Sequence, residues 1–222
     1  MNGPIVPLRF GLFLFIIAFL FAIVQLGVLG IAFDKLELSS NAAFTLLLAS
    51  LAGSLINLPI VRVSAERPAT EAQDDRPFGL FRQPTQEFTG QTIIAVNVGG
   101  CVVPLGFSLY LLLAHQLPLV PVIAAVLFVT TLSRLISMPI PGIGIGMPIF
   151  VAPLAAAIAG ITLGNADSAP IAYIAGTLGV LLGADLLRIR DIRRLGIPVA
   201  SIGGAGTFDG IFITGIVAVL LA

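Results

Sequence analysis

The chain consists of long apolar runs that are separated by polar segments. Seven runs of about 20 mostly apolar residues occupy residues 10–32, 42–61, 93–114, 119–137, 145–163, 169–187 and 198–222. A helix rises about 1.5 Å per residue and the hydrocarbon core of a bilayer is about 30 Å thick, so each run is long enough to cross it. The pattern predicts an all-α fold: a polytopic membrane helix bundle of about seven transmembrane helices, forming a single integral membrane domain over residues 1–222.

Composition supports the bilayer as the solvent. The chain is 58% hydrophobic and 10% charged, whereas a soluble domain is about 25% charged. The net charge of zero leaves no electrostatic footprint for nucleic acid. No cluster of Cys and His indicates a metal, and no nucleotide-binding fingerprint is present. We therefore expect no cofactor, no metal and no nucleic acid, with the lipid bilayer as the main partner.

The arginines predict how the helices are oriented. If the N-terminus lies in the cytoplasm, seven spans place ten of the eleven basic residues on the cytoplasmic side, and only Lys35 falls outside. Basic residues gather on the cytoplasmic side of membrane proteins. The prediction is thus a cytoplasmic N-terminus, an outer C-terminus, and a cytoplasmic loop at about 63–92 that is partly flexible.

Two acidic residues lie inside the predicted spans. Asp185 precedes Arg188 by about one helical turn, and Asp209 lies early in the last run. An ionisable group in a membrane is costly and suggests a function. The four glycines of Gly203–Gly210 argue against a regular helix there, and an unwound segment at 199–206 would bring Asp209 towards the cytoplasmic end, where Asp185 also lies. Unwound backbone is tolerated in a membrane only within protein or beside a wet cavity, so the sequence predicts a polar cleft.

Other unusual residues fall on the same side of the membrane. Asn97 begins the third span and Arg134 ends the fourth, while the prolines of the stretch 139–148 forbid an uninterrupted helix there. We therefore predict a cytoplasm-facing site with Asp185 and Asp209 as catalytic candidates. The substrate-binding candidates are Asn97, Arg134, Gly204, Gly206 and Thr207.

The amino-acid sequence resembles that of a prokaryotic membrane family catalogued as domain of unknown function 1614. The resemblance is carried by three segments: Asn97–Pro104, Gly176–Leu187 and Ala200–Gly215. The string Gly203–Gly210 is the most specific part of the resemblance, which covers most of the chain after about residue 90. The resemblance implies a multi-pass protein of a prokaryotic inner (plasma) membrane, and it implies no activity.

A looser resemblance is to the GxGD intramembrane aspartyl proteases, the group of presenilin, signal peptide peptidase and prepilin peptidase. Those enzymes carry one aspartate on one helix and a second in a glycine-rich motif at the start of the next. Asp185 matches the first and Asp209 the second. The chain departs from the pattern in two places: Ala184 precedes Asp185 where the family has tyrosine, and Thr207-Phe208 separate the glycine from Asp209.

Three functions fit these residues. The first is an aspartyl-type intramembrane peptidase acting on a membrane-embedded peptide, because two facing carboxylates share a proton and can activate water. The second is a transporter or channel for a small ion or polar solute, using the same acids. The third is a non-catalytic scaffold in which Asp185 pairs with Arg188 or Arg134.

Overall fold

The computed structural model describes residues 27–65, 90–204 and 210–222. Most of the first predicted span, the centre of the loop 63–92, and Gly206, Thr207 and Asp209 lie outside the described residues. The described part is mostly helical. Its longer helices are Gly27–Lys35, α2 (Ser40–Ser54), α3 (Val103–Ala114), α4 (Leu119–Ile136), α5 (Val151–Gly164), α6 (Ser168–Val180) and α7 (Gly210–Leu221).

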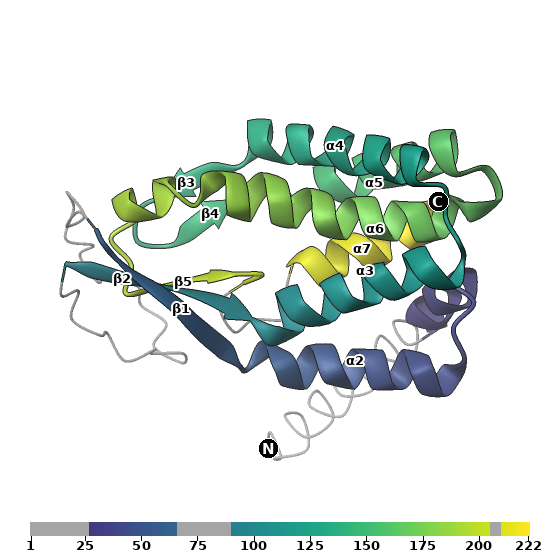
Figure 1. Cartoon of the computed structure of the whole chain (residues 1–222), viewed down its shortest axis with the longest axis horizontal. Coiled ribbons are helices and arrows are strands. Elements are labelled where there is room, and N and C mark those ends of the chain that lie inside the picture. Colours follow the sequence, from purple (N-terminus) through teal and green to yellow (C-terminus); the bar gives the residue numbers. More distant parts are fainter. Residues whose placement is uncertain (1–26, 66–89, 205–209) are drawn as a thin grey trace, which may run out of the picture.

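The helices form a bundle in which α6 is central (Figure 1). It packs against α3, α4, α5 and α7, and most of its residues are buried. Small residues allow this packing: a Cβ added at Gly179 would lie 2.6 Å from the Cβ of Val129 on α4, and one at Gly183 would lie 2.4 Å from the carbonyl oxygen of Thr130. The glycine face of Gly176, Gly179 and Gly183 is thus a helix-packing face.

The described residues include five strands, which lie at one end of the bundle and correct the all-α prediction (Figure 1). The larger sheet has the order β1-β2-β5, with β2 antiparallel to β1 and parallel to β5. The other is the hairpin β3–β4. Their bounds are β1 Asn57–Ser64, β2 Gln91–Asn97, β3 Met138–Ile140, β4 Gly144–Gly146 and β5 Val199–Ile202.

The predicted spans 42–61, 93–114 and 198–222 each overlap one strand of the larger sheet: β1, β2 and β5, respectively. Short apolar strands prolong the apolar runs of the helices, and apolar content alone does not distinguish a buried strand from a helix. Two local predictions are confirmed. The stretch 139–148 contains the β3–β4 hairpin and is not a helix, and Val199–Ile202, where the last predicted span begins, is a strand, so the last helix starts late and is described from Gly210.

Two helical runs among the described residues are long and apolar enough to cross a membrane: Leu119–Ile136 and Val151–Arg188. Asn165, with a φ of 48°, divides the second run into the arms α5 and α6, which pack against each other. A third span is reached if Gly27–Lys35 and Ser40–Ser54, bent by 110°, count as one. The chain therefore has helices compatible with a membrane protein.

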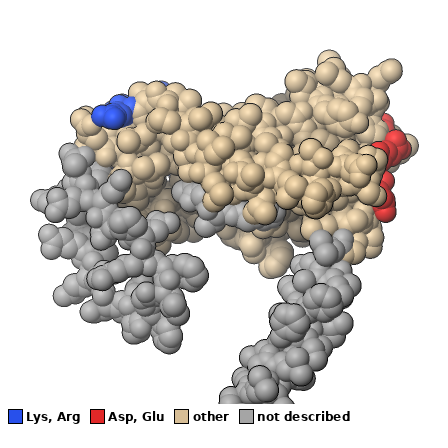
Figure 2. All heavy atoms as spheres, turned by 90° about the horizontal axis from the view of Figure 1, so that it is seen from below, with Lys and Arg blue, Asp and Glu red and all other residues tan. Residues whose placement is uncertain are grey.

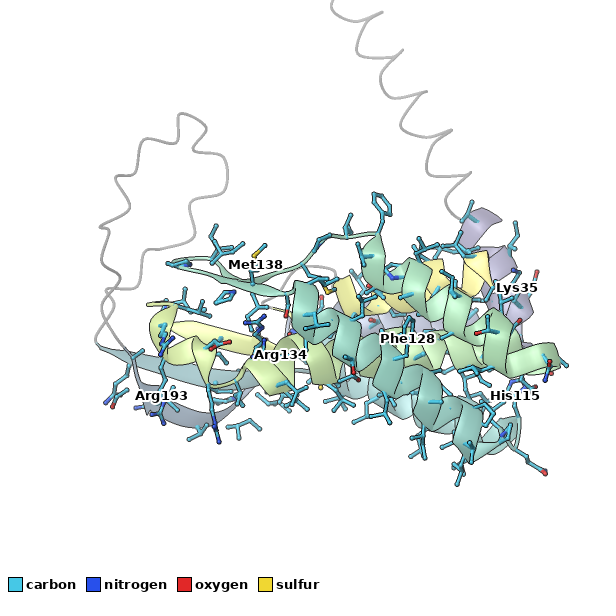
Figure 3. All side chains as sticks on the ribbon, turned by 90° about the horizontal axis from the view of Figure 1, so that it is seen from above. Lys35, His115, Phe128, Arg134, Met138 and Arg193 are labelled. Carbon is cyan, nitrogen blue, oxygen red and sulfur yellow. The ribbon has the colours of Figure 1, made fainter. Side chains whose placement is uncertain are left out.

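Charge is segregated along the bundle. On the face in Figure 2, basic side chains lie at one end and acidic ones at the other, with an uncharged surface between them. Figure 3 places Lys35 and His115 at one end, and Arg193 and Arg134 towards the other. Between the ends, α4 exposes large apolar side chains such as Leu127, which is 58% exposed. A broad exposed apolar surface between two polar ends is what a lipid-embedded bundle presents.

Candidate functional site

A cavity of about 330 Å³ lies where the helices meet the strands. This volume lies within the range of ligand-binding pockets. The cavity, here called the Asp185 cavity, is bounded by β4, β5, the start of α7 and the end of the α6 run. Most of its lining is apolar, and the polar side chains in its wall are Asp185, Ser201 and Thr214.

Asp185 is placed by an irregularity in its helix. After α6 the helix widens into the π-helical turn η4 (Leu181–Asp185) and then tightens into η5 (Leu186–Arg188). Such π-helical turns inside α-helices are frequent at functional sites. Here the turn ends on Asp185, and the Asp185 carboxylate lies in the cavity wall.

The carboxylate of Asp185 is held by the glycine-rich segment. Its Oδ2 accepts a hydrogen bond of 2.8 Å from the backbone N–H of Gly203. Gly203 has a φ of 84°, and a Cβ there would lie 2.7 Å from the backbone nitrogen of Cys101. Only glycine fits this backbone conformation and this close approach without strain. Gly203 thus joins the π-helical turn η2 (Val98–Val102) to Asp185.

Residues on both sides of the segment 205–209 line the same cavity. Gly204 lines it from the end of β5, and Ile211 lines it from the first turn of α7. Asp209 lies outside the described residues, but the chain that carries it enters and leaves at the cavity that contains Asp185. Because the last helix starts late, the segment 205–209 connects two parts of the chain that both line the cavity.

Asn97 organises the backbone near the cavity without lining it. The side chain is 1% exposed. Its amide nitrogen donates to the carbonyl oxygen of Ser54 at 2.7 Å and to Oδ1 of Asn57 at 3.1 Å, and its Oδ1 accepts from the N–H of Gly100 at 2.7 Å. Asn57 Oδ1 also accepts from the hydroxyl of Ser201 on β5. Asn97 therefore ties η2 and the end of α2 to the sheet.

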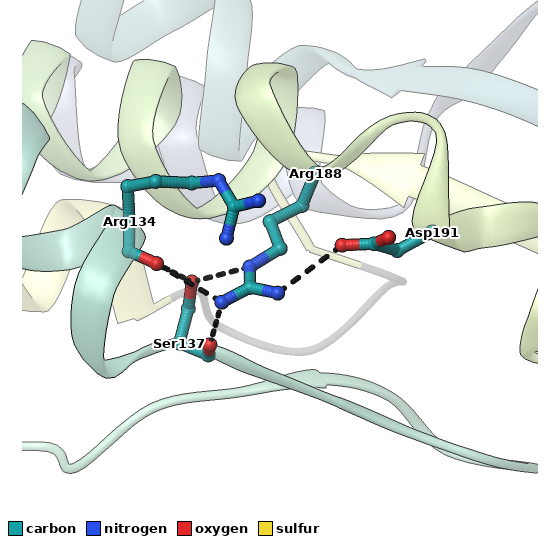
Figure 4. A network of polar contacts seen from close by, with 4 residues as sticks. All are labelled: Arg134, Ser137, Arg188 and Asp191. Atoms are coloured by element: carbon teal, nitrogen blue, oxygen red, sulfur yellow. Dashed lines mark hydrogen bonds and ion pairs between the residues drawn. The ribbon is translucent and has the colours of Figure 1, made fainter.

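Arg188 holds the end of α4 rather than Asp185 (Figure 4). Its Nε donates to Ser137 Oγ at 3.0 Å, and its Nη2 donates to the carbonyl oxygens of Arg134, at 3.0 Å, and Ser137. Nη1 makes an ion pair of 3.1 Å with Asp191. The scaffold interpretation had predicted that Asp185 pairs with Arg188 or Arg134, but among the described residues neither ion pair is present. Arg188 instead caps the last carbonyl groups of α4, which the helix leaves without partners.

The structure brings only some of the predicted site residues together. Asp185 and Gly204 line the cavity. Asn97 and Arg134 do not: Asn97 is enclosed in its hydrogen-bond network, and Arg134 is half-buried in the last turn of α4. Asp209, Gly206 and Thr207 lie outside the described residues.

Three contributors were missed in the sequence. Ser201 and Thr214 supply hydroxyl groups to the cavity wall, and Arg188 supplies the clamp on α4. Thr214 carried a signal, since it lies five residues after Asp209 in an otherwise apolar helix. Ser201 carried none, because its position depends on β5 being a strand.

A family model described as "Protein of unknown function (DUF1614)" matches residues 51–221. The match begins well before residue 90 and so includes the last turn of α2, all of β1 and the Asn97 network. No curated protein and no solved structure matches the chain.

Proposed function

Because the chain belongs to the family of proteins of unknown function DUF1614, whose model covers residues 51–221, its activity has to be inferred from the site, and we propose that it is an aspartyl-type intramembrane peptidase. The observation that carries the proposal is the place of Asp185 in the wall of an apolar cavity, hydrogen-bonded to Gly203, where the chain leads into and out of the segment with Asp209.

The chemistry needs only two carboxyl groups. One, charged, takes a proton from water as the water oxygen attacks the peptide carbonyl carbon; the other, protonated, hydrogen-bonds the carbonyl oxygen and then gives its proton to the leaving nitrogen as the C–N bond breaks. Facing carboxylates in a low dielectric share a proton in this way. Asp185 and Asp209 are the proposed pair, and the N–H of Gly203 orients Asp185.

The cavity favours an extended apolar peptide over a hydrated solute. All four residues of β5 line it, and β2 is the only described strand that pairs with β5. The outer edge of β5 therefore has backbone groups available for a further strand. The edge strand β1 is less suited, because it carries Pro59 and an irregularity of register between Pro59 and Val61, and both discourage strand addition. Asn97 acts on this site through the backbone that it holds, whereas Arg134 neither lines the cavity nor holds its backbone.

The orientation in the membrane is part of the proposal. Seven spans with a cytoplasmic N-terminus, an outer C-terminus and the arginine-rich end in the cytoplasm would make this a multi-pass protein of a prokaryotic inner membrane. The charge segregation described above supports this arrangement. The Asp185 cavity would then lie near the cytoplasmic leaflet.

The test uses the full chain reconstituted in liposomes with single-span peptides of about 20 apolar residues that carry a fluorophore and a quencher at opposite ends. We expect cleavage, and we expect Asp185→Asn and Asp209→Asn each to reduce it at least about a hundredfold. Asp34→Asn is the control and should cleave normally, because Asp34 is exposed, does not line the cavity, and precedes Lys35 at the opposite end of the bundle.

Full cleavage by Asp185→Asn would contradict the proposal, as would no cleavage of any peptide by the unmodified chain. Transport is distinguished in the same liposomes. Solute flux without cleavage, blocked by the same two substitutions, would assign the acids to a transporter instead.

A further inference from the structure

The arginine-rich end of the bundle carries more positive charge than its described acids neutralise. Arg188 is paired with Asp191. Four further arginines, here called the arginine cluster, make no ion pair with any described residue: Arg134, Arg190, Arg193 and Arg194. Arg190, Arg193 and Arg194 are exposed, and Arg134 is half-buried.

Arg134 is the arginine of the cluster whose charge water solvates least, because its side chain is half-buried while the other three are exposed. Its backbone carbonyl accepts from the Arg188 guanidinium at 3.0 Å, and in Figure 4 its side chain extends towards Arg188. Two guanidinium groups close together repel each other, and Asp191 neutralises only one. A second anion beside Arg134 would remove this repulsion.

The arginine cluster lies where the two membrane-crossing runs end. Arg134 is in the last turn of α4, and Arg190 follows the run Val151–Arg188 by two residues. Large apolar side chains are exposed directly beside them: Leu135 is 74% exposed and Leu187 is 57% exposed. Exposed leucines next to exposed arginines mark the level at which the hydrocarbon meets the headgroups.

The segment after the run holds its arginines outward. In η6 (Asp191–Arg194), Ile192 is buried in the core around the Asp185 cavity, as is Leu195 just after it. Arg193 and Arg194 are exposed between these two anchors. Their positions therefore follow from the packing of the short helix.

We propose that the arginine cluster binds the phosphate groups of anionic phospholipids, with Leu135 and Leu187 against the acyl chains. A guanidinium fork fits phosphate oxygens in a bidentate manner. The adjacent leucines favour a lipid over a soluble phosphate, because only a lipid brings acyl chains to the same place. The inference is independent of peptide cleavage.

The test is native mass spectrometry of the full chain in neutral detergent, titrated with phosphatidylglycerol or with phosphatidylcholine. An arginine near an anionic membrane surface strengthens binding about fivefold. We therefore expect phosphatidylglycerol to bind at least about tenfold more tightly than phosphatidylcholine. Replacing all four arginines of the cluster by glutamine should remove this preference, whereas replacing them by lysine should keep most of it.

Lys35→Gln, at the opposite end of the bundle, is the charge control and should keep the preference. Competition with inorganic phosphate separates the sources: displacement of the lipid by millimolar phosphate would assign the cluster to a soluble anion and overturn the proposal. Equal binding of the two lipids by the unmodified chain would also overturn it, and would point to the acids of residues 66–89 as the partners. If the glutamine variant does not fold, the four single variants are expected each to weaken phosphatidylglycerol binding, and unchanged binding in all four would refute the proposal.

Discussion

Replacing Arg188 by methionine is expected to destabilise the bundle by about 2–4 kcal/mol. The change keeps an unbranched side chain but removes four hydrogen bonds, one of which is also the ion pair with Asp191. A hydrogen bond to a charged group contributes about 1.5–3 kcal/mol. The side chain is 14% exposed and Asp191 is 27% exposed, so water replaces part of the loss. The backbone carbonyl of Ser137, a fully buried residue, is the partner left with the largest penalty.

The assay is unfolding in mixed micelles of dodecyl maltoside and dodecyl sulfate, followed by circular dichroism. Arg190→Met is the matched control, since this neighbouring arginine is exposed and has no described partner; it should change stability by less than about 0.5 kcal/mol. Arg188→Lys should lie between the two, because a lysine keeps the charge but loses the planar fork. Equal stability of Arg188→Met and Arg190→Met would show that the capping network does not hold the end of α4.

Two further predictions concern packing and the Asn97 network. Gly179→Ala should destabilise the bundle by about 1–3 kcal/mol, because the new Cβ would lie 2.6 Å from the Cβ of Val129. The control is Gly106→Ala, which should be neutral or slightly stabilising because the new Cβ would have nothing within 4 Å. Similar unfolding of the two variants would contradict the close approach of α4 and α6. Asn97→Ala should cost about 2–4 kcal/mol, since three hydrogen bonds are lost and the N–H of Gly100 is left without its acceptor. Wild-type unfolding of Asn97→Ala, measured in the same micelles, would refute the role of this network.

The helical part of the fold was accessible from the sequence because lipid imposes a length and a composition on each span. The runs 119–137 and 169–187 correspond closely to α4 and to α6 with its extension. Glycine and proline also carried correct local information: the stretch 139–148 is not a helix, and the last helix starts late. In these places a single residue type restricts the backbone whatever surrounds it.

The sheet was not accessible, for a physical reason. β2 and β5 lie side by side although about a hundred residues separate them in the chain, and the short apolar segment Val199–Ile202 has no periodicity of its own to distinguish a strand from a helix end. The consequences of that pairing, Ser201 in the cavity wall and Gly203 on the carboxylate of Asp185, were therefore hidden. Asp185 itself was found because an acid in an apolar helix is conspicuous without any tertiary information.

The proximity of Asp185 and Asp209 is the central claim, and cysteine cross-linking in membranes tests it most directly. The chain has one cysteine, Cys101, so a Cys101→Ala background carrying Asp185→Cys and Asp209→Cys reports this pair alone. A disulfide forms only when the two Cα atoms lie within about 7 Å. Arg62→Cys with Ile93→Cys, which are opposite each other in the β1–β2 ladder, is the positive control.

We predict rapid oxidation of the 185–209 pair by copper phenanthroline, at a rate comparable to that of the ladder pair. Asp185→Cys with His115→Cys, at the far end of the bundle, should not react. If the ladder pair cross-links and the 185–209 pair stays reduced, the two carboxyl groups do not meet, and the proposed catalytic pair is wrong.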